Sequence, residues 1–186
     1  MGFGFILVGY IFMCNFVLSS ETMFFDVFPD FIGWILLFIG CVKLSEFSKK
    51  IRIASFTAIP PAVISLYSFL YGFSVFSFLG EASDAIYEYS GYFLVVFSLA
   101  FHYLFFDGAR DIADECGSLG SLALRLRISA FASAAYFAAK LVLPLFAESA
   151  PGFYSAGVAV LYVVFSVLLL YNEAQIFGCF RQITYK

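Results

Sequence analysis

Six apolar runs divide the chain, and only short polar connections separate them. An α-helix needs about 20 apolar residues to cross the roughly 30 Å hydrocarbon core of a bilayer. Hydrophobic residues make up 63% of the 186 positions, against roughly 45 to 50% in soluble domains, so no water-soluble core could bury them. The sequence therefore predicts one all-α domain over residues 1–186, a polytopic membrane bundle of six transmembrane helices. These helices are expected at about residues 2–19, 31–46, 58–79, 91–106, 128–147 and 155–176.

Charged residues segregate between alternate connections. The connections after the first, third and fifth runs carry acids and no base: Glu21, Asp26, Asp30, Glu81, Asp84, Glu88 and Glu148. The other connections and the tail carry the bases Lys43, Lys49, Lys50, Arg52, Arg110, Arg125, Arg127, Arg181 and Lys186. Because Lys and Arg concentrate in cytoplasmic loops, the pattern predicts a multi-pass cell-membrane protein with both termini in the cytoplasm. The short runs 31–44 and 91–106 could instead be re-entrant, but the charges would then no longer segregate.

Two polar stretches outside the runs are also expected to be partly helical. The basic segment 45–56 would extend the second helix or form a short interfacial helix, since its Lys and Arg side chains attract anionic headgroups. Residues 107–127 would form one or two helical turns, broken at Gly117 and Gly120.

Several chemistries find no support in the sequence. The four cysteines are dispersed and have no C-x-x-C spacing, so we expect neither a disulfide framework nor a zinc site, and no cofactor. No loop has a basic cluster large enough for a nucleic-acid partner. The DGAR at 107–110 is similar to part of the CDP-alcohol phosphatidyltransferase motif, but the further aspartates that hold two metal ions are missing. No catalytic residue is predicted.

Lys140 is the one base that lies deep inside an apolar run. Placing it about 18 Å along its helix puts it past the membrane midplane, where an ionisable group costs about 2.5 to 3.5 kcal/mol. Ser133, Tyr136 and Lys140 share one helical face with Ser129. This face predicts a binding site for a small anionic or zwitterionic ligand. Alternatively, Lys140 reaches the outer interface and pairs with an acid there.

His102 and Asp30 are the other candidate site residues. His102, the only histidine, forms an i, i+4 pair with Ser98; it could sense protons, but a buried histidine bonded to a neighbour is the commoner case. Asp30 precedes the second helix, where a carboxylate can cap free N–H groups. Asp30 could also belong to an acidic mouth that attracts cations.

Two further helical patterns bear on partners. Tyr162, Ser166 and Glu173 share a face of the sixth helix, where Glu173 is expected near the cytoplasmic end, capping the bundle or meeting Arg181. In the fifth helix, rows of alanine four residues apart would allow close approach of another helix. The rows are formed by Ala130, Ala134 and Ala138, and by Ala135 and Ala139.

The stretch FPDFIGWILLFIGCVKLSEF, at 28–47, resembles an element of small uncharacterised membrane proteins of Gram-positive bacteria. In size, helix number and topology, the chain is also similar to the substrate-binding components of energy-coupling-factor vitamin transporters. That second resemblance implies a ligand that binds from the outer side among the later helices, close to Tyr136 and Lys140.

Taken together, these patterns favour a protein of the lipid bilayer that binds or transports a small molecule through a site in the outer half of the bundle. Its predicted site residues are Lys140, Tyr136, Ser133, His102 and Asp30. An alternative is a structural or regulatory subunit that packs against another membrane protein through the alanine rows. A third class, an intramembrane enzyme, has no motif in its support.

Overall fold

The computed structural model of the protein describes residues 2–13, 17–19, 24–26, 29–115, 119–142 and 151–182. Helices form almost all of these described residues. The elements in order are α1 (Gly2–Phe12), β1 (Val17–Ser19), β2 (Phe24–Asp26), α2 (Asp30–Leu44), α3 (Lys49–Thr57), α4 (Ile59–Gly72), the 3-10 turn η1 (Ser77–Leu79), α5 (Glu81–Glu115), α6 (Leu119–Val142) and α7 (Pro151–Gln182).

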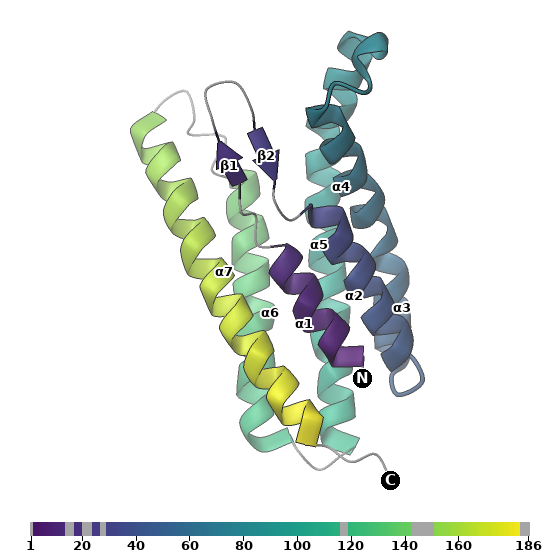
Figure 1. The fold of residues 1–186 in the computed structure, drawn as a ribbon. Helices are drawn as coiled ribbons and strands as arrows, with labels where there is room; N and C mark the ends of the chain where they lie inside the picture. Colours follow the sequence, from purple (N-terminus) through teal and green to yellow (C-terminus); the bar gives the residue numbers. More distant parts are fainter. Residues whose placement is uncertain are drawn as a thin grey trace.

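The helices run alternately up and down the bundle (Figure 1). Each pass along the bundle is a leg, and α3 and α4 together form one leg. The starts of α1, α3 and α6 and the ends of α2, α5 and α7 lie at the lower end in that view, so the chain begins and ends at the same end. Along the sequence, each predicted run thus corresponds to one leg.

Four of these legs are long and apolar enough to cross a membrane: Lys49–Gly72, the whole of α5, Leu122–Ala139 within α6 and Val163–Phe180 within α7. The 11 residues of α1 are about 16 Å long, and the 15 residues of α2 about 22 Å, both less than a bilayer core. The membrane character predicted from composition is therefore carried by the four longer legs.

The first predicted helix, 2–19, is wrong in its second half. The helix ends at Phe12, and β1 pairs antiparallel with β2 so that Val17 lies opposite Asp26 and Ser19 opposite Phe24. A short apolar run cannot by itself distinguish helix from strand, and Val and Phe both favour strands. The described residues of this first run therefore form the helix α1 and the short strand β1.

The third predicted helix, 58–79, is wrong at both ends. The helical segment begins at Lys49, the first residue of α3. The Ala58 N–H donates to the Ala54 carbonyl (3.1 Å), so the helical hydrogen bonds continue from α3 into α4. Pro60 and Pro61 follow in the first turn of α4, where no N–H donor is needed. The helix ends at Gly72, before a turn and η1.

The later helices are longer than hydropathy predicts, because their polar ends are helical too. The predicted 91–106 is α5, which includes Glu81 and Asp84 in its first turn and continues to Glu115. The predicted 155–176 is α7, and the predicted 128–147 begins nine residues earlier as α6. The break expected at Gly120 is wrong, because Gly120 is helical within α6. Residues 143–147 and Gly117 lie outside the described residues.

Glycines allow α1 and α2 to pack closely. An added Cβ at Gly9 would lie 2.9 Å from the Gly33 carbonyl oxygen, and one at Gly33 would lie 2.8 Å from that of Gly9. Gly2, seven residues before Gly9, and Gly40, seven residues after Gly33, face each other in the same manner. Side chains on these helices cannot fit between the backbones, so this crossing depends on glycine.

The core lies where α2 and α5 are enclosed by their neighbours. Trp34 and Leu37 from α2 and Phe101 and Phe105 from α5 are each at most 1% exposed. The Trp34 ring packs edge-on against Phe101, with ring centroids 5.3 Å apart. Below this core, Lys50 at the start of α3 joins α5 through ion pairs to Asp107 (2.7 Å) and Asp111 (3.0 Å).

Candidate functional site

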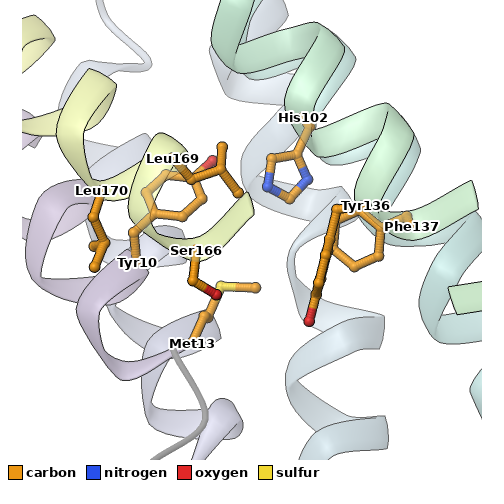
Figure 2. Close-up of a pocket in the computed structure, with 8 residues that line it drawn as sticks. All are labelled: Tyr10, Met13, His102, Tyr136, Phe137, Ser166, Leu169 and Leu170. Carbon is orange, nitrogen blue, oxygen red and sulfur yellow. The ribbon is translucent and has the colours of Figure 1, made fainter. Parts of the chain in front are cut away.

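A small cavity lies near the middle of the bundle, between α1, α5, α6 and α7 (Figure 2). Its volume of about 30 Å³ is enough for one or two water molecules. The lining is mostly apolar but includes an imidazole, two phenols and a hydroxyl, from Tyr10, Met13, His102, Tyr136, Phe137, Ser166, Leu169 and Leu170. Small-molecule sites are usually lined in this way, by mostly apolar side chains with a few polar groups among them.

The cavity adjoins the end of α1. Tyr10 and Met13 belong to its last turn, and the Met13 N–H donates to the Gly9 carbonyl (3.1 Å) as the final helical bond. A helix C-terminus carries partial negative charge and carbonyls without helical partners. Broken helices of this kind line the binding sites of many membrane transporters.

His102 forms the centre of the aromatic part of the site. It is 2% exposed, and its Nδ1 lies 2.6 Å from the Ser98 carbonyl oxygen. Because a carbonyl oxygen only accepts, Nδ1 carries the hydrogen, which leaves Nε2 of the neutral ring as an acceptor. The rings of Tyr10 and Phe137 lie 5.7 and 5.2 Å from the imidazole, centroid to centroid. The predicted pairing with Ser98 therefore exists, but through its backbone.

The predicted face of α6 divides between the cavity and the core. Tyr136 lines the cavity, whereas Ser133 is fully buried beside it and donates its hydroxyl hydrogen to the Ser129 carbonyl (2.8 Å). Lys140 lies in α6 one turn beyond Tyr136, and its side chain is outside the described part of the structure.

Asp30 does not line this cavity. It is half-buried and is the first residue of α2 instead of the residue before the helix, and Pro29 occupies the N-cap position. Its carboxyl group still lies in the first turn, where negative charge is favourable. The acidic residues Glu81 and Asp84, expected in a loop, are instead helical, and Asp84 accepts a hydrogen bond from Tyr71 (2.6 Å).

Sequence reasoning missed Tyr10 and placed Ser166 outside the site. Nothing in the apolar first run indicates that Tyr10 lines a cavity. The seven-residue spacing of Gly2 and Gly9 could, however, have indicated that this helix packs deep in the bundle. The Tyr10 hydroxyl is buried and has no hydrogen-bond partner among the described residues. In Figure 2 the Tyr10 ring extends toward the imidazole of His102.

Glu173 lies directly below the cavity. It follows Ser166, Leu169 and Leu170 on the same face of α7, one turn closer to the lower end. Its side chain is 2% exposed, so Glu173 is a core residue and not the surface cap that the sequence indicates. The side chain of Arg181, its expected partner, lies outside the described residues.

No known protein family, curated protein or solved structure matches the chain. Within the described residues, no group of three or more His, Cys, Asp or Glu side chains could hold a metal ion. The site can therefore be interpreted only from its own geometry, which offers hydrogen-bond donors and acceptors in a mostly apolar, aromatic setting.

Proposed function

We propose that this protein crosses the membrane six times, with both termini in the cytoplasm, and binds a small polar solute in the cavity between α1, α5, α6 and α7. The observation that carries the proposal is a mostly apolar cavity inside the bundle that contains an imidazole, two phenols and a hydroxyl and adjoins the end of the short helix α1. Membrane proteins place non-helical backbone at membrane depth where it is enclosed by protein or lines a cavity.

The arrangement of charges supports the proposed orientation. Basic residues of α2, α3, α5 and α6 gather at the end of the bundle where the chain begins and ends, namely Lys43, Lys49, Lys50, Arg52, Arg110, Arg125 and Arg127. Glu81, Asp84 and Glu88 lie at the start of α5, at the opposite end. This separation is the one that cytoplasmic and external surfaces show.

The position of Lys140 favours an anionic or zwitterionic solute. It follows Tyr136 by one turn of α6, so a basic residue lies on the helix that lines the cavity, and a base attracts a negatively charged group of a solute. A cavity of about 30 Å³ holds no more than a few atoms. Binding a larger solute would require α1 and α7 to separate.

Replacing Ser166 by phenylalanine tests the site, because the larger ring fills the cavity. We expect a small-solute panel to include compounds that raise the melting temperature of the purified wild-type protein and that fail to do so for Ser166→Phe. Val167→Phe is the matched control: Val167 is the next residue on α7 and 62% exposed, so its substitution leaves the cavity open.

Two results would count against the proposal. One is that no anionic, zwitterionic or neutral solute stabilises the wild-type protein. The other is that a stabilising solute acts equally on Ser166→Phe and Val167→Phe, which would place its binding elsewhere.

A role as a partner subunit is the second candidate, and one observation favours it. Ala134 and Ala138 are exposed on α6, and the nearby Phe131 is 76% exposed, so this part of the alanine row faces away from the bundle. Small residues four apart allow a further helix to pack closely. Filling the cavity at Ser166 would leave such packing unchanged, so the same variant separates the two functions.

A further inference from the structure

The carboxyl group of Glu173 forms no ion pair with any base of the described residues. Its Oε1 atom is buried and lacks a hydrogen-bond partner in the described part of the chain, and the ion pairs found there all belong to Lys50. A buried ionised carboxylate is strongly unfavourable without a counter-charge or several donors. Inside a membrane, such a residue is by default part of a functional site.

Two helices pack against α7, and neither supplies a described base that faces Glu173. From α1, the titratable neighbour is Tyr10: Phe3 of α1 stacks on Phe180 of α7, and Tyr10 and Glu173 each lie seven residues, about two turns, further up these packed helices. From α6, the guanidinium of Arg125 lies over the ring of Tyr171, 6.0 Å from its centroid, and Tyr171 is exposed on the outer face of α7.

The groups beyond this first layer are also uncharged or distant. From α2, the titratable group is the buried thiol of Cys41. From α5, the imidazole of His102 lies 5.7 Å from the Tyr10 ring, centroid to centroid.

A proton satisfies this environment better than a metal ion does. A bound metal ion requires several oxygen or nitrogen ligands, and the described residues provide no cluster of acidic, histidine or cysteine side chains. A single proton converts the carboxylate into a neutral acid that can donate one hydrogen bond. The nearby Tyr10 hydroxyl can accept such a bond and also donate one toward the cavity.

We propose that Glu173 is a proton-binding site, and that Tyr10 links it to the cavity so that proton binding and solute binding influence each other. The first half stands on the burial of Glu173 alone, whereas the link rests on the proposed function. Each proton taken up turns one carboxylate into a carboxylic acid and raises the net charge of the bundle by one.

Infrared spectroscopy of the purified protein in lipid tests the proton site. We expect the difference between wild type and Glu173→Gln to contain the C=O stretch of a carboxylic acid at neutral pH, and this band to disappear at higher pH. Glu115→Gln is the control, since Glu115 is exposed at the end of α5 and should give no such band. If Glu173→Gln does not fold, Glu173→Asp keeps the acid and should shift the band. A folded wild type with no carboxylic-acid band attributable to Glu173 at neutral pH would overturn the proton site.

The link to the cavity is tested by removing the Tyr10 hydroxyl. Tyr10→Phe should move the pH at which the band disappears by about one unit or more, since each unit corresponds to about 1.4 kcal/mol. Tyr103→Phe, 69% exposed on α5, should leave it unchanged. A band that is present but unmoved in Tyr10→Phe overturns the link and leaves the proton site. A band that moves, together with a solute panel without hits, overturns the proposed function instead.

Discussion

Replacing Gly33 by alanine should lower the free energy of unfolding by about 1 to 3 kcal/mol, the usual cost of forcing an extra carbon into a closely packed site. The added Cβ would lie 2.7 Å from Met13 Cγ and 2.8 Å from the Gly9 carbonyl oxygen. The methionine can move, but the backbone oxygen cannot without separating α1 from α2. The effect is measured by heating the protein in mild detergent and determining the fraction that remains monodisperse. The double variant Gly9→Ala/Gly33→Ala should be less stable than either single variant.

Gly91→Ala and Gly178→Ala are matched controls, because both glycines are helical and an added Cβ at either would meet nothing within 4 Å. Alanine favours the helix over glycine by up to about 1 kcal/mol, so these variants should be as stable as the wild type or slightly more so. A loss of stability at Gly91 or Gly178 equal to that at Gly33 would show that the crossing is not specially close.

Truncating Trp34 to alanine should have a still larger effect, about 3 to 5 kcal/mol, because it removes the largest side chain of the core. Trp34 is 1% exposed and packs edge-on against Phe101 and His102, with centroids 5.3 and 6.2 Å away. The same heating assay measures this loss. Since Trp34 supports the imidazole, solute stabilisation should also weaken in whatever Trp34→Ala protein remains folded.

Phe93→Ala is the comparison for Trp34→Ala, since Phe93 is 60% exposed on α5 and faces outward. Its loss should change the melting temperature little. If both variants lose equal stability, the core does not lie between α2 and α5 as described.

Hydropathy and charge predicted the order of the helices because both properties act over whole segments. A leg occurs at each apolar run, and basic residues from four helices meet at one end of the bundle. Boundaries were predicted less well, since hydropathy detects only the apolar part of a helix. The long α5 shows this most clearly: its polar ends at Glu81 and Glu115 are helical but invisible to an apolar pattern.

The site was predicted in part, and the reasons differ between residues. His102 and Tyr136 line the cavity, as their position on predicted helix faces indicated. Tyr10 was missed because the first run was taken as one continuous helix, whereas the half-length α1 ends at the cavity. Glu173 is surrounded in sequence by Asn172 and Gln175, which suggest a surface, and only the packing of α1 against α7 buries it.

The number of crossings depends on the first two legs. α1 covers about half of a bilayer core and α2 about 22 Å, so the proposed six crossings require these helices to span the membrane together with the residues that connect them. If these legs instead entered and left on one side, the four longer legs alone would cross, and the N-terminus would lie on the same side in either case. The connection between β1 and β2 is the part of the chain whose location distinguishes the two arrangements.

Labelling a cysteine at that connection with a membrane-impermeant maleimide in intact cells is the most direct measurement. In a variant without the native cysteines, Phe78→Cys, in η1, marks the end proposed to be external, and Phe47→Cys, between α2 and α3, marks the end proposed to be cytoplasmic. Six crossings predict that Thr22→Cys reacts in intact cells, as Phe78→Cys does. Reaction of Thr22→Cys only after the membrane is permeabilised, as for Phe47→Cys, would contradict them.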